Sequence, residues 1–275
     1  MKTFLVRTVT GILFITVVIT SILFSDKVDM LMFNVFLVFT CIALYEYRNL
    51  LLQKNIKLSL FFFYAISLML YFILSFNELR NLMPTISLFS LILVMFLLLF
   101  IVELFRKQEN PFIIIAYSIL GIVWIVFPFS LINHIPSMLY GGKFFLLSIF
   151  LFVWMYDTFA YCVGSLLGKH RLMPRISPKK SWEGAIGAAV LTMGFAFFMP
   201  KIFTMLPLTA FQWVLFAAIL VVASTLGDLA ESMFKRQLSV KDSGTILPGH
   251  GGILDRFDSI LFVIPFVILY LTFIL

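Results

Sequence analysis

The sequence predicts an all-α integral membrane protein, and three observations lead to this fold class. First, 62% of the 275 residues are hydrophobic and only 12% are charged, whereas soluble domains contain about 45–50% apolar and about 25% charged residues. Second, apolar runs of about 20 residues, the length with which a helix crosses a bilayer, recur along the chain. Third, backbone polar groups in lipid must be satisfied within each segment, so these runs are expected to be helices.

Nine candidate spans follow one another along the chain. The apolar stretch of the first span begins at Phe4 and has no small-residue cleavage site, so we interpret it as a membrane helix and not as a removable signal peptide. The nine spans are predicted at residues 4–24, 29–50, 58–76, 85–104, 111–132, 144–167, 184–200, 209–227 and 257–275.

Lys and Arg residues are unequally shared between the two sides of these spans. With the N-terminus inside, 16 of the 20 fall on the inner side, and four, Lys27, Arg80, Lys143 and Lys201, fall on the outer side. Cytoplasmic segments collect basic residues, so the N-terminus is predicted in the cytoplasm and the C-terminus outside. The same rule accounts for the net charge of +7. Nucleic acid is not expected as a partner, because no aromatic-basic surface module is visible.

The two halves of the sequence differ in character. Residues 1–143 are predicted to form hydrophobic scaffold helices and to provide oligomer contacts. Residues 144–275 contain the specific polar groups and the two longest inner loops, predicted at 168–183 and 227–257. No internal repeat is evident, which weakens an interpretation as an inverted-repeat transporter. Cys41 and Cys162 lie in apolar runs without CxxC spacing, so they are predicted to be core thiols and not zinc ligands.

The end of the eighth span has a polar face. Ser224, Asp228, Glu231 and Lys235 are spaced i, i+4, i+7 and i+11, so they share one side of a helix. One interpretation is a solvated helix end with a Glu231–Lys235 pair. The other is a cavity, metal or partner facing Asp228, which lies on the span side of the boundary, where a charge costs up to about 2.5–3.5 kcal/mol.

The stretch "PGHGGILDRFD" at residues 248–258 joins a glycine-rich loop to an acidic helix start. Gly249, Gly251 and Gly252 let the backbone adopt positive φ and approach a ligand closely. A glycine-rich turn that opens a helix can cradle phosphate, because its free N–H groups favour anions. Glycines also simply form loops, and both interpretations stay open.

Asp255 and Asp258 follow at i and i+3, on one side of the ninth helix. The helix dipole favours an acid at this end, which explains one aspartate but not two, together with Asp228 across the loop. Such carboxylates would repel one another unless a cation held them, and Mg²⁺ is the hard, oxygen-seeking ion that also binds phosphates. A metal site is therefore predicted at Asp228, Asp255 and Asp258.

Two further features belong to the same half. The loop "GKHRLMPRISPKKSWEG" contains five basic residues and one acid, Glu183, and would attract anions, although positive-inside charge and anionic lipid explain it equally. Asp157 lies about 16 Å along the sixth span from Gly168 and shares a face with Tyr161 and Gly164. It is either an internally hydrogen-bonded packing residue or the wall of a polar cavity open to the cytoplasm.

These residues together resemble a known family. The pattern Ser232-x-x-Lys235-Arg236, then Lys241-Asp242, then Pro248-x-His250-Gly251-Gly252-x-x-Asp255-Arg256-x-Asp258 resembles the signature of phosphatidate cytidylyltransferases (CDP-diacylglycerol synthases). The segments "ISPKKSWEG" and "DTFAYCVGSLLGKH" also resemble the family, so the likeness covers residues 155–258.

The resemblance implies a phospholipid-synthesising nucleotidyltransferase. CTP and phosphatidate would give CDP-diacylglycerol and pyrophosphate, with Mg²⁺ and a second, monovalent cation such as K⁺. It also implies a multi-pass protein of the bacterial inner membrane, a homodimer, with its active site facing the cytoplasm.

The residues and the resemblance together suggest the following roles. The residues expected to be catalytic are Asp228, Asp255, Asp258, Lys235 and Arg236. The residues expected to bind substrate are Lys179, Lys180, Ser232, Lys241, Asp242, His250, Gly251, Gly252, Arg256 and Asp157. The phosphate of phosphatidate is already nucleophilic at neutral pH, so the lack of an obvious catalytic His or Cys is no objection.

Three other functions compete with this one. A polyprenol (dolichol-type) kinase would transfer the γ-phosphate of CTP and release CDP. A CDP-alcohol phosphotransferase would show a DG-x-x-AR pattern, which is missing. An anion transporter fits nine spans and an embedded Asp157, but not the gathering of polar groups at one face or the expected lack of charged residues inside the first five spans.

Overall fold

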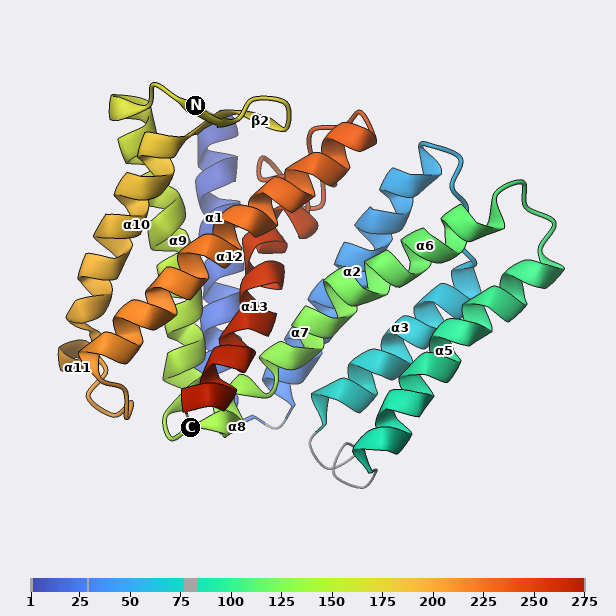
Figure 1. Cartoon of the computed structure of the whole chain (residues 1–275), viewed down its shortest axis with the longest axis horizontal. Helices are drawn as coiled ribbons and strands as arrows, with labels where there is room; N and C mark the ends of the chain where they lie inside the picture. Colours follow the sequence, from blue (N-terminus) through green and yellow to red (C-terminus); the bar gives the residue numbers. More distant parts are fainter. Residues whose placement is uncertain (1, 29, 77–83, 275) are drawn as a thin grey trace. The chain divides into compact units, whose positions relative to one another are not determined.

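A computed structural model describes residues 2–28, 30–76 and 84–274, with side chains from residue 6 onward in these ranges. Helices dominate the chain (Figure 1). Seven helical segments of the described residues are long and apolar enough to cross a membrane: α1 (Lys2–Leu23), α2 (Leu31–Leu52), α5 (Thr85–Phe105), α6–η1–α7 (Pro111–Ile132), α9 (Gly142–Leu167), α12 (Ala210–Gln237) and α13 (Leu254–Ile274). Two shorter apolar helices, α3 (Leu60–Ser75) and α10 (Trp182–Phe197), occupy the other two predicted positions. The helical membrane class is confirmed, whereas nine crossings and the sides of the termini stay predictions.

The chain divides into two compact units. The first contains Met1–His134 and Asp242–Leu254, and the second contains Ile135–Lys241 and Asp255–Leu275. Helix α8 (Ile135–Met138) packs with α9 in the second unit, and the loop 242–254 contacts α1 and α2 in the first. The halves expected at 1–143 and 144–275 stay a prediction.

The first unit contains α1, α2, α3, α5 and the three-part segment α6 (Pro111–Gly121), η1 (Ile122–Val126) and α7 (Phe127–Ile132). The π-turn η1 lies just before Pro128, a residue that lacks an N–H and clashes with the carbonyl four residues earlier. Tyr47 of α2 packs against Gly121 and donates a hydrogen bond to the Tyr117 carbonyl at 2.8 Å. The wide turn is therefore held by a neighbouring helix.

The second unit places α9, α10 and α12 side by side (Figure 1). Glycines allow their close approach: a Cβ on Gly184 of α10 would lie 2.9 Å from Cα of Gly164 in α9. Likewise, a Cβ on Gly227 of α12 would lie 2.9 Å from the Asp258 carbonyl of α13. Farther along, the rings of Phe152 and Trp213 stack at 6.0 Å between α9 and α12. Backbones that approach this closely bring polar side chains of four elements together.

The inner loop predicted at 168–183 is more ordered than expected. It folds into an antiparallel hairpin of β1 (Arg171–Met173) and β2 (Ser177–Ser181), and α10 already begins at Trp182. Ser181 ends the second strand and caps α10, since its hydroxyl accepts the Gly184 N–H at 3.2 Å. A short helix, α11 (Met199–Ile202), then leads to α12.

The segment predicted as an inner loop at 227–257 is helical at both ends. Helix α12 continues to Gln237, and α13 begins at Leu254. The hydropathy of the sequence falls at Asp228, but the helix goes on because Leu229 and Phe234 are buried and because Glu231 pairs with Lys235 one turn later. The polar face predicted from i, i+4 spacing thus lies on continuous helix.

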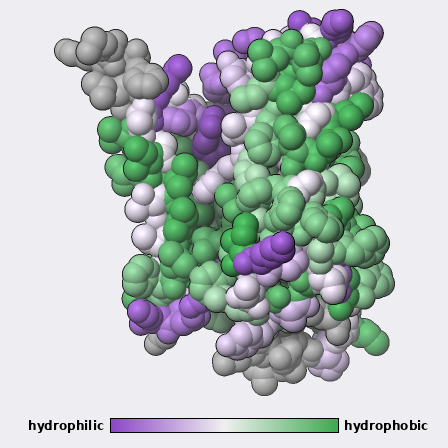
Figure 2. Space-filling view, turned by 90° about the vertical axis from the view of Figure 1, so that its left-hand side faces the viewer, coloured by the Kyte–Doolittle hydropathy of each residue, from purple (hydrophilic) through white to green (hydrophobic). Residues whose placement is uncertain are grey.

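The outer surface of α10 fits a lipid environment. Figure 2 shows a face of the molecule on which hydrophobic residues predominate. Ile186, Val190 and Phe197 of α10 have more than half of their surface exposed, and contiguous exposed apolar surface marks membrane or protein contact. This agrees with α10 as a membrane helix despite its short length.

The packing of α9 on α10 can be tested at Gly184. A Cβ there would lie 2.9 Å from the Ala160 carbonyl oxygen as well as from Gly164. Since both atoms belong to the backbone of α9, we expect Gly184→Ala to lower the free energy of unfolding by about 1–3 kcal/mol. In the same helix, a Cβ on Gly194 would meet no atom within 4 Å, so Gly194→Ala should be neutral or stabilising by up to about 1 kcal/mol. Thermal unfolding of the two variants in detergent, followed by circular dichroism, measures the difference. Equal melting temperatures for Gly184→Ala and Gly194→Ala would refute the close packing of α9 on α10.

Candidate active site

A cavity of about 520 Å³ with charged groups in its wall lies in the second unit, between α9, the hairpin, α10 and α12. Its wall combines small residues with charged ones. The charged lining residues are Asp157, Arg171, Lys179, Lys180 and Asp228. The small lining residues are Ala160, Gly164, Ser165, Gly168, Ser181, Gly184 and Ala185. Three cations and two carboxylates around one cavity suit a ligand that bears phosphate groups.

Helix α9 supplies one wall of this cavity. Asp157, Tyr161, Gly164 and Gly168 all line it, as their shared helical face suggests. Behind Asp157, the hydroxyls of Tyr156 and Thr225 lie 2.6 Å apart and join α9 to α12 by a hydrogen bond. The wall is thus fixed by a polar contact between the two helices.

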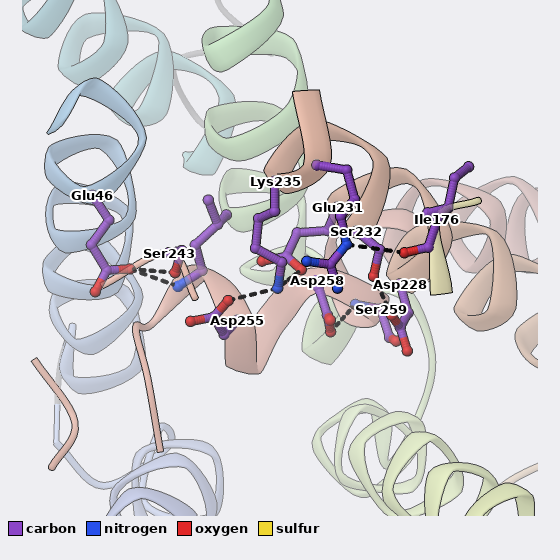
Figure 3. Close-up of polar contacts among 12 residues, drawn as sticks. Glu46, Ile176, Asp228, Glu231, Ser232, Lys235, Ser243, Asp255, Asp258 and Ser259 are labelled. Carbon is purple, nitrogen blue, oxygen red and sulfur yellow. Dashed lines mark hydrogen bonds and ion pairs between the residues drawn. The ribbon is translucent and has the colours of Figure 1, made fainter. Parts of the chain in front are cut away.

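Lys180 and Asp228 form an ion pair across the cavity wall, between the hairpin and α12. Each side chain is 29% exposed, so both can still reach a ligand. The Ser232 hydroxyl, one turn further along α12, donates to Oδ1 of Asp228 at 3.2 Å (Figure 3). Asp228 is therefore oriented from two sides.

Asp258 of α13 faces the same group of charges. Its Oδ1 accepts the Ser259 N–H at 2.6 Å, and the Ser259 hydroxyl donates to the Ser224 carbonyl of α12 at 3.3 Å. The carboxylate of Asp258 interacts electrostatically with those of Asp228 and Asp157. Three carboxylates from three helices thus act on one another.

Lys235 lies between two other acids. Its ammonium pairs with Glu231 on α12, and it donates a hydrogen bond to Oδ1 of Asp255 on α13 at 2.8 Å (Figure 3). The Lys235 side chain is only 14% exposed, and both acids are less exposed still. This triad ties α12 to α13 and gives Lys235 and Asp255 partners within the protein.

The remaining predicted cations lie nearer the surface. Arg236 is exposed and donates to the Ile176 carbonyl of the hairpin at 3.3 Å. Arg256 is exposed and interacts electrostatically with Asp157. Lys179 is exposed on the cavity wall, and Lys241 is exposed at the end of the second unit.

The start of the hairpin is held by Glu183. Its carboxylate accepts the backbone N–H groups of Lys169 and His170, and also contacts Nδ1 of His170 at 2.6 Å. Hydrogen bonds from its own backbone N–H and from the His170 side chain lower the pKa of Glu183 to about 2. Glu183 therefore stays ionised at neutral pH and orders the turn that leads into the basic strand.

The glycine-rich loop belongs to the first unit, together with Asp242, which is exposed. Gly249 and Gly251 have φ of 77° and 85°, and the Leu247 N–H bonds the Gly251 carbonyl at 3.0 Å. His250 packs against Gly11 of α1. Fold requirements thus account for these two glycines without a ligand.

The three aspartates predicted to hold a metal do not form one compact group. Asp255 pairs with Lys235, whereas Asp228 and Asp258 interact with each other. Across residues 2–28, 30–76 and 84–274, no three His, Cys, Asp or Glu side chains converge closely enough to hold an ion. Mg²⁺ is nevertheless usually bound by only one or two carboxylates together with water and substrate phosphates, and the Asp228–Asp258 pair offers that donor set.

Sequence reasoning missed several residues of this region. Thr225 and Tyr156 in apolar helices and Ser181 at the end of β2 line the cavity, but single hydroxyl groups gave no distinctive signal. Glu46 is buried within α2 although the first five spans were expected to lack interior charges. That expectation is wrong, and an acid in the run "ALYEYRNL" was the available signal.

The fold and cavity define the class: a multi-pass membrane protein with a cavity lined by charged residues. Comparison with known proteins gives the family. The model of the Cytidylyltransferase family matches residues 5–274. Two proteins named phosphatidate cytidylyltransferase, from Staphylococcus saprophyticus and Staphylococcus haemolyticus, are 35% and 37% identical to this chain over 260 residues, which is 94% of this chain and 96% of each relative. The chain belongs to the cytidylyltransferase family and is a nucleotidyltransferase.

The buried triad makes a prediction about stability. Lys235→Met should lower the free energy of unfolding by about 3–5 kcal/mol, because it leaves Glu231 and Asp255 buried without their cation. Arg236→Met, at the exposed neighbour, should change it by less than about 0.5 kcal/mol. Chemical unfolding of both variants in detergent measures the difference. A Lys235→Met protein as stable as the wild type would show that the triad does not hold α12 to α13.

Proposed function

We propose that the protein transfers the CMP moiety of CTP to phosphatidate, giving CDP-diacylglycerol and pyrophosphate. The observation that supports this most directly is the cavity that combines Lys179, Lys180 and Arg171 with Asp157 and Asp228. Full-length similarity to proteins named phosphatidate cytidylyltransferase supports the choice of substrates.

In this reaction, a phosphate oxygen of phosphatidate attacks the α-phosphorus of CTP. A new P–O bond forms, the bond from the α-phosphorus to its bridging oxygen breaks, and the electron pair leaves with pyrophosphate. The attacking phosphate is mostly dianionic at neutral pH, since its second pKa is about 6. No protein base is needed, so the task of the site is to hold two anions together and to balance developing charge.

The basic residues take the anions. Lys179 and Arg171 lie on the hairpin wall of the cavity, and Lys180 is held there by Asp228. We assign these three to the phosphates of the substrates, with the exposed Arg236 and Arg256 at the outer edge. Lys235 is assigned to the triad that orders α12 and α13, because it already pairs with two acids.

The acidic residues favour a divalent cation. Asp157, Asp228, Glu231, Asp255 and Asp258 interact with one another and with Lys180, Lys235 and Arg256. The carboxylates of Asp228 and Asp258 repel each other, and a divalent cation would offset this repulsion. Asp228 and Asp258 would hold Mg²⁺ together with substrate phosphates. When bound, the ion neutralises charge on the transferring and leaving phosphates. The second, monovalent cation stays an expectation from the resemblance.

The membrane setting follows from the lipid substrate. Its acyl chains stay in the bilayer, while its phosphate must reach a polar site. The excess of Lys and Arg on the inner segments supports an active site on the cytoplasmic side of the cell membrane, where CTP is available. We also propose a homodimer, on the resemblance alone.

The reaction is tested with purified protein in detergent, given CTP, phosphatidate and Mg²⁺. We expect pyrophosphate in amounts equal to CDP-diacylglycerol, and none without lipid or with EDTA. Asp258→Asn should lower kcat at least about 100-fold, because the variant loses a carboxylate of the metal pair. Release of CDP in place of pyrophosphate would indicate a polyprenol-type kinase instead. A folded protein that turns over none of several lipids would favour an anion transporter.

The hairpin assignment has its own test. Lys179→Gln should lower kcat/KM for CTP by about 10- to 100-fold, since a hydrogen bond to a charged group contributes about 1.5–3 kcal/mol. Arg175 provides a matched control: it is exposed in the turn of the same hairpin and is not among the residues that line the cavity. Arg175→Gln should retain wild-type kcat/KM. Equal losses in both variants would mean that the hairpin acts only through its overall charge.

A further inference from the structure

Glu46 of α2 is the buried acid that holds the glycine-rich loop. Glu46 is only 2% exposed. The carboxylate accepts hydrogen bonds from the Ile253 N–H at 3.1 Å and the Leu254 N–H at 2.9 Å. It also accepts the Ser243 hydroxyl at 3.4 Å, so it bonds both ends of the loop (Figure 3).

These contacts satisfy groups that would otherwise be costly to bury. Leu254 is the first residue of α13, and the first N–H groups of a helix have no partner within it. The same helix end carries partial positive charge, which favours an anion. Glu46 thus works as a helix cap supplied from 208 residues away in the sequence. The N–H groups of Ile253 and Leu254, which the sequence suggested for a phosphate, are taken by a carboxylate of the chain.

Two glycines of the loop leave room for this carboxylate. A Cβ on Gly244 would lie 2.5 Å from Oε1 of Glu46, and a Cβ on Gly252 would lie 2.5 Å from Oε2. Neither glycine has a left-handed φ, unlike Gly249 and Gly251. A larger side chain at 244 or 252 would therefore displace the Glu46 carboxylate.

We propose that Glu46 is a positioning residue of the active site. Asp255 follows Leu254 directly, and Asp258 lies one turn later in α13. A carboxylate that fixes the Ile253 and Leu254 amides therefore sets the point from which both aspartates project. Its effect on turnover rests on the proposed function, whereas its effect on the loop does not.

The test uses the full-length protein with Glu46→Gln. This change keeps the shape but replaces one acceptor oxygen with an NH₂ group, which faces an N–H donor. Amide exchange in the peptide containing residues 253 and 254 should accelerate at least about tenfold, and kcat should fall about 10- to 100-fold, with KM for CTP nearly unchanged. Glu46→Asp keeps the charge and should recover part of kcat.

Two further variants test the same role of Glu46 if Glu46→Gln folds poorly. Gly244→Ala presses on the same carboxylate and should show the same local exchange and the same fall in kcat. Glu103→Gln is the matched control, a buried acid of α5 in the same unit, paired with Arg106. It should lower stability while leaving exchange at residues 253–254 and kcat as in the wild type.

The outcomes separate the two proposals. The role of Glu46 would be overturned if Glu46→Gln and Gly244→Ala both kept wild-type amide exchange and wild-type kcat. It would also be overturned if amide exchange rose equally throughout α2 and Glu103→Gln showed the same rise. A wild-type protein without turnover would overturn the proposed function. In that case the exchange data would still decide whether Glu46 positions the loop.

Discussion

The cost of an uncompensated charge in a membrane helix is the constraint on which the rest of this structure depends. A charged residue at the bilayer centre costs about 2.5–3.5 kcal/mol on the insertion scale, so acids in apolar helices need partners. Three acids show how this need is met. Glu46 accepts hydrogen bonds from amides of the loop 242–254, Asp255 forms an ion pair with Lys235, and Asp228 forms one with Lys180. The pairing of charges thus decides which elements lie together.

The site takes its character from where this pairing is incomplete. Asp157, Asp228 and Asp258, from α9, α12 and α13, repel one another electrostatically. A bound cation would offset this repulsion, as we propose for Asp228 and Asp258. The triad around Lys235 joins α12 to α13, and we propose that Asp228, Asp258 and the hairpin cations act on the substrates.

Much of this could be predicted from the sequence, because helical periodicity fixes local neighbours. The shared face of Asp157, Tyr161 and Gly164 required only a helix of regular pitch, and so did the Glu231–Lys235 pair. Contacts between distant segments could not be predicted. Lys235 and Asp255 are 20 residues apart, and Glu46 and Leu254 are 208 apart; only tertiary packing chooses such partners. Helix α12 extends beyond the span end predicted at residue 227, because hydropathy reports the membrane boundary, whereas helix length follows backbone hydrogen bonding.

The most direct test of the central claim is a measurement of Mn²⁺ binding by electron paramagnetic resonance, since Mn²⁺ takes the same oxygen ligands as Mg²⁺. The full-length protein in detergent would be measured with CTP and without lipid, beside Asp258→Asn and Asp255→Asn. We expect Asp258→Asn to lose bound Mn²⁺ and folded Asp255→Asn to retain it. Unchanged binding in Asp258→Asn, or loss of binding only in folded Asp255→Asn, would contradict the assignment of the metal to Asp228 and Asp258.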